Sequence, residues 1–479
     1  MLYYSLNDPS TRVTFKEATI RGQAPDKGLY FPESIPTLPQ TFFDNIGTMS
    51  REEIAYQVIR PFTGDTLPEA ELRRIVAETI NFDFPLVPVT DNTWALELFH
   101  GPTLAFKDVG ARFMSRCLGY FVRENAAAGS KDLVNDKGST PVRPVTVLVA
   151  TSGDTGGAVA SGFYDVEGVN VVILYPSGKV SSVQELQLTT LGKNISALEV
   201  DGSFDDCQQM VKDAFADPVL QEKLFLTSAN SINVARWLPQ QFYYFFAWQQ
   251  WAALFPEATR SAAATPGAAT AQPGAPVISV PSGNFGNICA GLMAWSAGLP
   301  VNHFIAACNA NDTIPLFLAT GQYRSKLARP TLSNAMDVGN PSNFVRILEI
   351  FGKQLPGTPA PGLSTTLPAI REILTAYSIT DEETVATIRD LNTNHHYLPD
   401  PHGAVGYLAL EKYLANHPGG KGIFLETAHP VKFYDTVEPV IGEKIPLPLA
   451  VGPLLNKQKQ SKKIAAHYEE LKDFLLSYR

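Results

Sequence analysis

Residues 145–160 have the sequence VTVLVATSGDTGGAVA, in which an apolar run, a glycine-rich turn and the start of a helix follow one another. Residues 277–291, VISVPSGNFGNICAG, repeat this order. Short apolar runs bounded by turn residues predict buried strands. Two strand–loop–helix units therefore predict an α/β fold with parallel sheets. Further apolar runs that predict strands occur near residues 171–175, 196–200, 303–307 and 422–426.

Both glycine-rich loops have the composition of an anion cup. Glycine allows the backbone to adopt positive φ and to approach a ligand closely, and free amides at a helix N-terminus attract negative charge. Either loop alone is also compatible with an ordinary turn between a strand and a helix. Neither loop has the spacing of a dinucleotide fingerprint or of a Walker loop.

The first loop contains short motifs that also occur in two classes of protease. GDTGG at 153–157 is similar to the nucleophile loop of chymotrypsin-like proteases, but threonine stands in place of the serine. The Asp-Thr-Gly triplet at 154–156 is similar to an aspartic protease loop, which needs a second copy that the sequence lacks. Both protease interpretations are therefore set aside.

Upstream of both units, residues 100–108 have the sequence HGPTLAFKD. The apolar residues of the region that follows recur at three- and four-residue steps: Phe106, Val109, Phe113, Cys117 and Tyr120. This periodicity predicts an amphipathic helix with Lys107 in its first turn. The positive end of the helix macrodipole disfavours an ammonium group there. Because only the neutral amine of a lysine is nucleophilic, this position favours Schiff-base chemistry.

The lysine segment and the two loops, in this order, resemble fold type II pyridoxal-phosphate-dependent enzymes, and most closely the threonine synthase family. Further motifs that resemble this family are GLYFP at 28–32, SANSIN at 228–233, DPHGAVG at 400–406 and ETAHP at 426–430. Their joint occurrence in order is highly specific, whereas each motif alone is not. The resemblance implies a fold like that of the tryptophan synthase β chain, with the cofactor between two parallel-sheet α/β domains.

The domain organisation that we expect has four parts. These are an N-terminal region at 1–90, a smaller α/β domain at 91–255, a larger α/β domain at 277–450 and a C-terminal helical tail at 451–479. A run of lysines precedes the expected tail helix, which starts near Ile464. The small and polar residues of 126–144 and 258–276 predict two insertions, the second of them a mobile loop.

The resemblance implies which residues bind pyridoxal 5'-phosphate. Lys107 would hold the cofactor as a Schiff base and then move protons on the substrate, and Thr427 would hydrogen-bond the pyridine nitrogen. Asp154 would contact the cofactor ring, where related enzymes usually carry asparagine. A carboxylate there would either repel the phenolic oxygen or, if protonated, donate a hydrogen bond to it. The cup for the cofactor phosphate would consist of Ser282, Gly283, Asn284, Phe285, Gly286 and Asn287.

The resemblance also implies residues that bind the substrate. A second phosphate needs its own charged partner, and a guanidinium suits it through bidentate contacts. Arg236 follows the SANSIN motif at a spacing similar to that of the family's substrate-phosphate segment, with Ser231, Thr155 and Asn284 as helpers. A surface arginine at the start of a helix is the alternative. The substrate carboxylate would lie in the loop that contains Thr151, Ser152, Gly153 and Thr155.

The implied reaction converts O-phospho-L-homoserine and water to L-threonine and phosphate by γ-elimination and β-hydration. Two alternatives remain open. One is a related β-eliminating enzyme or dehydratase that acts on a hydroxy-amino acid, and the other is a catalytically silent homologue that binds a metabolite. The segment ending at Arg236 favours a phosphorylated substrate, and the presence of Lys107, the cup and Thr427 favours an active enzyme.

The composition is that of a globular enzyme with several domains, because 479 residues with 45% hydrophobic content can form an ample core. A net charge of −9 argues against nucleic acid or an acidic membrane as a partner. No run is long and apolar enough for a bilayer, and no secretory signal is evident, so we expect a cytoplasmic protein. The four scattered cysteines predict reduced thiols, and the histidines lack partners at metal-ligand spacing. The oligomeric state stays open between monomer and homodimer.

Overall fold

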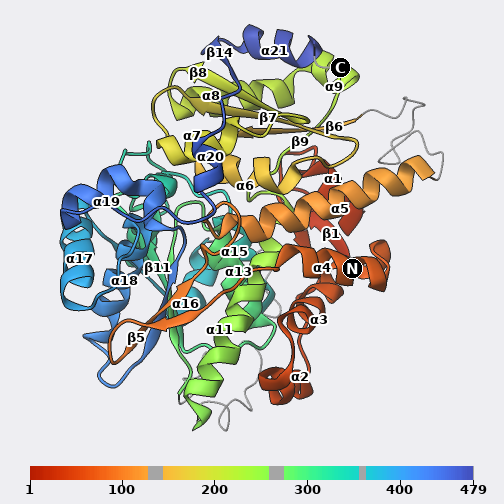
Figure 1. Cartoon of the computed structure of the whole chain (residues 1–479). Helices are drawn as coiled ribbons and strands as arrows, with labels where there is room; N and C mark the ends of the chain where they lie inside the picture. Colours follow the sequence, from red (N-terminus) through yellow and green to blue (C-terminus); the bar gives the residue numbers. More distant parts are fainter. Residues whose placement is uncertain (128–143, 258–273, 355–362, 478–479) are drawn as a thin grey trace.

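The structure, a computed structural model, describes residues 1–127, 144–257, 274–354 and 363–477. These residues form three β-sheets: a small antiparallel sheet in the N-terminal region, a five-stranded sheet at the top of Figure 1, and a six-stranded sheet below it. Most of the two expected insertions, 126–144 and 258–276, falls outside the described residues.

The five-stranded sheet is parallel throughout, in the order β14-β8-β7-β6-β9. Its strands are β6 (Val145–Ala150), β7 (Val169–Pro176), β8 (Ile195–Asp201), β9 (Phe225–Thr227) and β14 (Ser461–Ala465). Val147 and Val149 of β6 pack in the core that includes α5, whereas Leu148 packs in the core that includes α8. Both faces of β6 are therefore buried, which explains its continuous apolar run.

Helices cover both faces of this sheet (Figure 1). The helices on one face are α5 (Lys107–Ala127), α6 (Asp154–Phe163) and α7 (Ser182–Thr189). The helices on the other face are α8 (Phe204–Ala216), α9 (Pro218–Lys223) and α21 (Tyr468–Ser477). The helix predicted from the apolar periodicity does begin at Lys107.

The six-stranded sheet has the order β12-β11-β10-β13-β5-β4, in which β4 runs antiparallel to β5 and the other pairs are parallel. Its strands are β4 (Leu86–Pro88), β5 (Thr93–Glu97), β10 (Val277–Pro281), β11 (His303–Cys308), β12 (Leu374–Ser378) and β13 (Gly422–Glu426). The strands predicted near 277–281, 303–307 and 422–426 are confirmed, as are those of the smaller sheet.

Helices also enclose this sheet. α18 (Pro401–Leu414) packs on β10, β11 and β13, and α17 (Asp381–Asn394) packs on α18. α13 (Gly286–Ser296) contacts β11, α11 (Gln241–Leu254) and α15 (Phe344–Gln354). The remaining helices of this part are α10 (Val234–Trp237), α14 (Thr313–Thr320), α16 (Leu363–Ile373), α19 (Tyr434–Ile441) and α20 (Gly452–Leu455).

The N-terminal region joins both larger units. Its sheet has the order β2-β1-β3 and consists of β1 (Leu2–Ser5), β2 (Val13–Thr14) and β3 (Tyr30–Pro32). Its helices are α1 (Phe15–Arg21), α2 (Gln40–Asn45), α3 (Arg51–Thr63) and α4 (Glu69–Thr79). Thr14 begins α1 with a capping box, because its hydroxyl accepts from the Glu17 amide and the Glu17 side chain accepts from the Thr14 amide.

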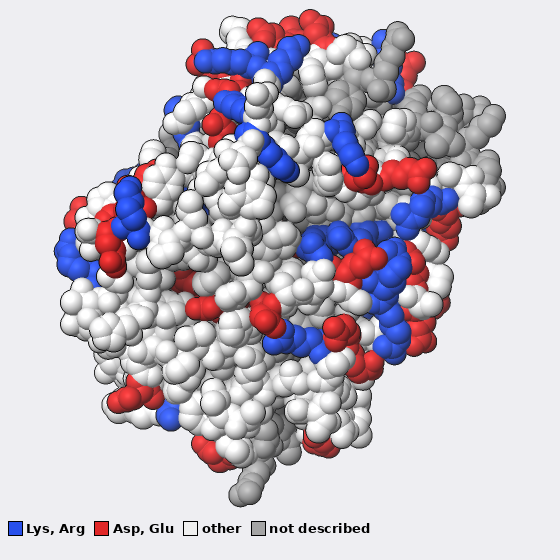
Figure 2. All heavy atoms as spheres, viewed as in Figure 1, with Lys and Arg blue, Asp and Glu red and all other residues white. Residues whose placement is uncertain are grey.

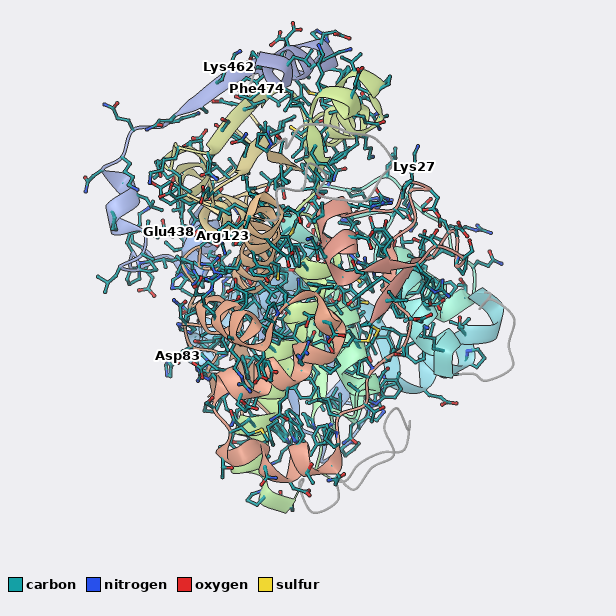
Figure 3. The ribbon with its side chains drawn as sticks, turned by 90° about the vertical axis from the view of Figure 1, so that its right-hand side faces the viewer. Lys27, Asp83, Arg123, Glu438, Lys462 and Phe474 are labelled. Carbon is teal, nitrogen blue, oxygen red and sulfur yellow. The ribbon has the colours of Figure 1, made fainter. Side chains whose placement is uncertain are left out.

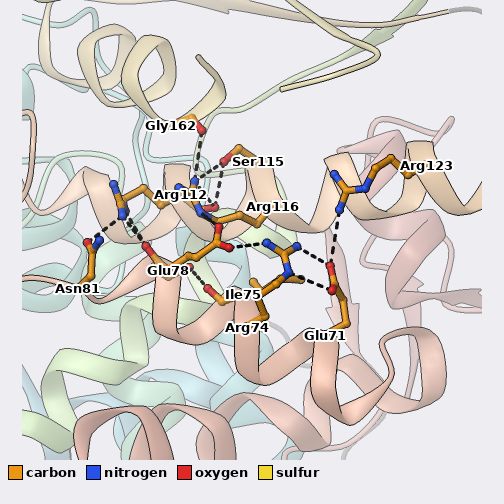
Figure 4. Close-up of polar contacts among 11 residues, drawn as sticks. Glu71, Arg74, Ile75, Glu78, Asn81, Arg112, Ser115, Arg116, Arg123 and Gly162 are labelled. Carbon is orange, nitrogen blue, oxygen red and sulfur yellow. Dashed lines mark hydrogen bonds and ion pairs between the residues drawn. The ribbon is translucent and has the colours of Figure 1, made fainter. Parts of the chain in front are cut away.

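An ionic network fastens α4 to the helix that begins at Lys107 (Figure 4). The Arg116 guanidinium of α5 lies 3.1 Å from the Glu78 carboxylate of α4 and 3.3 Å from the Gly162 carbonyl of α6. Arg74 binds Glu71 and Glu78 within α4. The network therefore holds α5 from the side opposite the five-stranded sheet.

Two elements differ from the sequence predictions. The expected boundary at 91 places residues 93–97 in the domain that contains the strands of 145–227. In the structure these residues form β5, which pairs with β13 of the larger sheet instead. The tail is not wholly helical, because Ile464 lies in β14, which pairs with β8, and α21 begins only at Tyr468. Both strands are short, and their place is determined by partners far away in the sequence.

Charged side chains gather over α4 and α5 and around β14 and α21 on the face drawn in Figure 2. At the end of the chain, the Lys462 ammonium of β14 lies 5.4 Å from the centre of the Phe474 ring of α21, and the two side chains lie side by side in Figure 3. Within the described residues, no helix is long and apolar enough to cross a membrane. All four cysteines are free and buried, as predicted.

Candidate active site

Three neighbouring strands of the larger sheet deliver three of the predicted segments to one edge. β10, β13 and β5 are parallel neighbours, so their carboxyl ends meet at that edge. The loop 282–287 follows β10, Thr427 follows β13, and the segment that leads to Lys107 follows β5. The Phe106 amide donates to the Thr427 carbonyl at 2.9 Å, which fixes Lys107 beside the end of β13.

Lys107 is largely buried, with 16% of its side chain exposed. Its Nζ lies 3.9 Å from Oδ2 of Asp154. Burial lowers the pKa of Lys107, Asp154 opposes this shift, and the cations Lys432 and Arg236 add to it. The sequence predicts the same direction from the helix macrodipole, and in the structure burial and two neighbouring cations also lower this pKa.

Asp154 is buried between two lysines. Its Oδ1 lies 2.9 Å from Nζ of Lys432 and 3.0 Å from Nε2 of Gln184, which donates to it. Burial raises the pKa of Asp154, but Lys432 and Lys107 outweigh that effect and hold it below its ordinary value. The two ammonium groups therefore favour the ionised form of Asp154, the first of the two states that the sequence left open.

The loop 151–155 is ordered from within by Thr151. The Thr151 hydroxyl accepts from the amides of Gly153 at 3.0 Å and Gly156 at 2.8 Å, and the side chain is buried. Gly153 has φ of +134°, and a Cβ there would lie 2.4 Å from the Gln184 side chain. Thr151 thus fixes the conformation of the loop through its hydroxyl. Ser152 and Thr155 are half-buried.

The loop 282–287 forms a tight cradle before α13. Phe285 adopts a left-handed conformation with φ of +61° at the helix N-cap, a conformation that costs free energy for a residue other than glycine. Gly283 is required, because a Cβ there would lie 2.6 Å from Cα of Met336. The Ser282 hydroxyl donates to the Val280 carbonyl at 2.7 Å, so its proton is already engaged.

Asn287 supplies an unpaired donor in this cradle. Its Oδ1 accepts from the Tyr243 hydroxyl at 2.7 Å and from the Tyr244 hydroxyl at 2.8 Å. Its Nδ2 is buried and has no hydrogen-bond partner among the described residues. The first amides of α13, at Gly286 and Asn287, also have no acceptor within the helix. An anion such as a phosphate fits this set of donors.

Asn284 connects the cradle to the segment 228–236. Its Nδ2 donates to Oγ of Ser231 at 2.9 Å, and its Oδ1 accepts from the Ser342 amide at 2.6 Å. Asn343 donates to the same Ser231 oxygen at 3.0 Å. The predicted helpers Ser231 and Asn284 are thus in direct contact.

Arg236 is buried, with 2% of the residue exposed, and it has no carboxylate partner among the hydrogen bonds and ion pairs of the described residues. Its Nε and Nη1 have no hydrogen-bond partner there. The guanidinium packs on α5, because a Cβ at Gly110 would lie 3.2 Å from its Nε. Burial lowers the pKa of Arg236 to about 10, so it remains a cation at neutral pH. The alternative, an arginine at the protein surface, is therefore excluded.

Arg346 of α15 is a second buried guanidinium, and all three of its nitrogens are paired. Nη1 donates to the Ser231 carbonyl at 3.0 Å and to Oδ1 of Asn343 at 2.6 Å. Nη2 donates to the carbonyls of Ile232 at 2.5 Å and Tyr30 at 3.1 Å. Nε also donates to Tyr30. Arg346 therefore fastens the segment of Ser231 to the N-terminal region.

Thr427 is buried next to the carboxyl group of Glu426. Burial and the neighbouring Asp400 raise the pKa of Glu426 well above its ordinary value. Oε1 of Glu426 accepts from the Asp400 amide at 2.6 Å, and Gly403 leaves room for the carboxyl group. Asp400 in turn lies 2.5 Å from Nδ1 of His402. The surroundings of Glu426 therefore favour its neutral form and reduce the negative charge next to Thr427.

Sequence reasoning did not find six residues that complete this site. They are Gln184, Tyr243, Tyr244, Asn343, Arg346 and Lys432. Lys432 offered a weak signal, because it lies between the apolar residues Val431 and Phe433 directly after the ETAHP motif. Tyr243 and Tyr244 lie in the aromatic run of α11 and are buried, and an apolar run of this kind gives no signal for the role of their hydroxyl groups.

Three family models match the chain. The model described as "Threonine synthase N terminus" matches residues 2–80, "Pyridoxal-phosphate dependent enzyme" matches 85–425, and "Threonine synthase, C-terminal" matches 403–475. Together they extend over nearly the whole chain, as the motifs do.

Individual relatives are similar over the full length. A threonine synthase of Serratia marcescens is 40% identical over 99% of each chain. The crystal structure of threonine synthase from Escherichia coli matches with a TM-score of 0.84 at 39% identity and covers 100% of both chains. The structure of PLP-bound threonine synthase from Brucella melitensis has the same TM-score at 33% identity, and it covers 99% of this chain and 98% of its own.

Proposed function

The chain belongs to the threonine synthase family of pyridoxal-phosphate-dependent lyases, and on this premise we propose that it converts O-phospho-L-homoserine and water to L-threonine and phosphate. The fold type II architecture and the cofactor expected from the sequence are confirmed by the same relatives. The substrate and the role of each residue are part of the proposal.

In this proposal Lys107 holds the cofactor through its amine, and the cradle 282–287 binds the cofactor phosphate. The unpaired Nδ2 of Asn287 and the first amides of α13 are the donors that support this assignment. Thr427 donates to or accepts from the pyridine nitrogen, beside Glu426, whose pKa is raised by burial. When bound, pyridoxal phosphate supplies an acceptor for the electrons left behind by proton removal next to the substrate amine.

The observation that carries the substrate assignment is the unpaired guanidinium of Arg236. A buried cation without a partner is costly, so its free Nε and Nη1 suit an anion that arrives with the substrate. One phosphate site is already assigned to the cofactor at 282–287. Arg236 therefore binds the phosphate of the substrate, with help from Ser231 of the same segment and from Asn284, which donates to Ser231.

Lys107 moves the protons of the reaction. Its lowered pKa allows the amine to be neutral, so it removes the proton from Cα of the substrate and returns protons later. Loss of a proton from Cβ then allows phosphate to leave from Cγ, and water adds at Cβ to give threonine. The loop 151–155 receives the substrate carboxylate with the free amides at the start of α6.

The dehydratase alternative makes no use of Arg236. An enzyme for unphosphorylated serine or threonine has no second phosphate to bind, and a buried, unpaired guanidinium in its site would only reduce stability. The catalytically silent alternative makes no use of a lysine with a lowered pKa at the start of α5. These two residues favour the phosphorylated substrate and an active enzyme.

Release of products from O-phospho-L-homoserine tests the proposal. We expect the purified, cofactor-loaded protein to release L-threonine and phosphate in equal amounts, and Lys107→Ala to reduce this rate by at least about 100-fold. A 2-oxo acid formed from L-serine or L-threonine, without turnover of the phosphorylated substrate, would establish the dehydratase instead. A cytoplasmic location, the oligomeric state and the domain boundaries stay predictions.

A further inference from the structure

We propose that Lys432 is a positioning residue that holds Asp154 in a buried ion pair and thereby keeps the Lys107 amine free to bond with the cofactor. This inference rests on the proposed attachment of the cofactor to Lys107. It concerns the chain before any substrate binds, so it is tested separately from the reaction.

Two lysines compete for one carboxylate. Lys432 is fully buried and lies 2.9 Å from Oδ1 of Asp154, whereas Lys107 lies 3.9 Å from the other oxygen, Oδ2. Gln184 also donates to Oδ1 at 3.0 Å. The close partner of Asp154 is therefore Lys432, and Lys107 is held at a distance longer than a hydrogen bond.

The position of Lys432 is itself fixed. Its Nζ donates to the Thr103 carbonyl at 2.7 Å, and Thr103 lies in the segment that leads to Lys107. The Thr103 amide and hydroxyl bind Asp108, the residue after Lys107, at 2.9 and 2.6 Å. The ammonium of Lys432 thus connects the start of α5 to Asp154 of α6.

The other charged groups near Lys107 do not replace this arrangement. Asp400 favours the ammonium form of Lys107 and Arg236 disfavours it. Burial raises the pKa of Asp108, and both oxygens of this neighbour already accept hydrogen bonds from Thr103. His429, which also faces Lys432, has its pKa lowered by burial to about 4 and is neutral at pH 7.

Without Lys432, Asp154 should form its ion pair with Lys107 instead. A carboxylate without its close partner in a buried site attracts the nearest remaining cation. Lys107 would then be held as an ammonium ion, which cannot attack the aldehyde of the cofactor. The bond forms only when the neutral amine adds to the aldehyde carbon and water leaves, so the rate reports the fraction of neutral Lys107.

The test is the rate at which the full-length, cofactor-free chain bonds with added pyridoxal phosphate, followed by visible absorption across a range of pH. For Lys432→Met we expect a rate at neutral pH reduced about tenfold and a pH midpoint raised by about one unit relative to wild type. In Asp154→Asn/Lys432→Met we expect the midpoint to return close to that of wild type. Lys444→Met is the matched control, because Lys444 binds Glu438 at the surface, and it should leave the midpoint unchanged.

Each outcome decides the inference. A wild-type midpoint in Lys432→Met overturns it, and so does a raised midpoint that persists in the double variant, because Lys432 would then act without Asp154. If Lys432→Met does not fold, Lys432→Gln replaces it, since an amide can still donate to the Thr103 carbonyl. A bond that still forms in Lys107→Ala would overturn the proposed attachment residue, independently of the role of Lys432 in the ion pair.

Discussion

Arg236 lies in the segment 228–236 and Arg346 binds this segment; both guanidinium groups are buried, and they differ in what their nitrogens bind. Every nitrogen of Arg346 donates to a carbonyl or amide oxygen. Two nitrogens of Arg236, Nε and Nη1, have no partner among the described residues. The residues are of the same type and similarly buried, so neither composition nor burial separates their roles.

The difference indicates which arginine belongs to the fold and which to the ligand. Arg346 stabilises the folded chain, because its donors satisfy the carbonyls of Ser231 and Ile232 and that of Tyr30, which lies far from them in sequence. Arg236 retains the cost of a desolvated cation in the free protein, and a phosphate would offset that cost. Relief of this desolvation cost on binding of the phosphate would contribute to substrate affinity, whereas the cost itself lowers the stability of the free protein.

The largest effect that separates the two arginines is expected in Arg236→Met. Loss of a buried, charge-assisted partner of the phosphate should reduce kcat/KM for O-phospho-L-homoserine by about 100- to 1000-fold. The denaturation midpoint should stay the same or rise, because an unpaired buried cation is removed. Steady-state kinetics and denaturant titration on one preparation measure both quantities. Equal losses of activity and stability would place Arg236 in the same role as Arg346.

Arg346→Met should show the opposite pattern. Three buried carbonyls lose their donors, at about 1 kcal/mol or more each, so we expect the free energy of unfolding to fall by roughly 3 kcal/mol. The KM of the folded fraction should change much less than in Arg236→Met. Urea titration followed by circular dichroism gives the stability. Arg346→Lys is the control, because it keeps the charge and loses the forked geometry. A variant as stable as wild type would contradict the role of Arg346 as a clamp.

Asp154, like Arg346, is a buried charged group with its partners in place, and its ionisation should affect how the free energy of unfolding depends on pH. The pKa of Asp154 is lower in the folded chain than in the unfolded chain, so its contribution is fully present above the ordinary aspartate pKa and is lost as pH falls through the folded value. The difference in stability between wild type and Asp154→Asn should therefore be constant from about pH 7 to 5 and should shrink below about pH 4. A difference that grows with acidification would show that the carboxylate is not ionised in the folded chain.

The smallest effect is expected at Tyr244, which helps to orient Asn287. In Tyr244→Phe, Oδ1 of Asn287 keeps the hydroxyl of Tyr243, so Nδ2 should still point into the cradle. The affinity for pyridoxal phosphate should fall only several-fold, because one hydrogen bond contributes about 1 kcal/mol. Loss of both hydroxyls in Tyr243→Phe/Tyr244→Phe should lower the affinity for the cofactor, in free energy, by more than the sum of the two single variants. Fluorescence titration of the cofactor-free chain measures this, and an unchanged affinity in the double variant would exclude Asn287 from the cup.

Much of the fold was predictable because its strands are continuous apolar runs. β6, β10 and β13 lie inside their sheets and are buried on both faces. A strand buried on both faces needs apolar residues at successive positions, and these are visible in the sequence. β5 and β14 were misplaced because the choice of partner strand depends on contacts over long sequence separations. For β14 the exposed lysines of an edge strand also have the composition of a solvated helix.

Site residues that lie in recognisable motifs were predictable. Site residues whose role depends on their burial in the folded chain were not. Lys107, Asn287 and Arg236 lie in or next to recognisable motifs. Lys432 and Arg346 are charged residues outside the recognised motifs, and exposure is the ordinary expectation for such residues. Only the packing of chain segments from several elements makes them buried and assigns their partners.

The most direct test of the account is competition by inorganic phosphate in the cofactor-loaded protein, in which the proposed cup at 282–287 would already hold the cofactor phosphate. We predict that phosphate competes with O-phospho-L-homoserine in wild type and that this inhibition weakens at least about tenfold in Arg236→Met. In Arg346→Met, assayed where the variant is folded, the inhibition constant should stay within about threefold of wild type. Unchanged inhibition in Arg236→Met would contradict the assignment of Arg236 to the substrate phosphate.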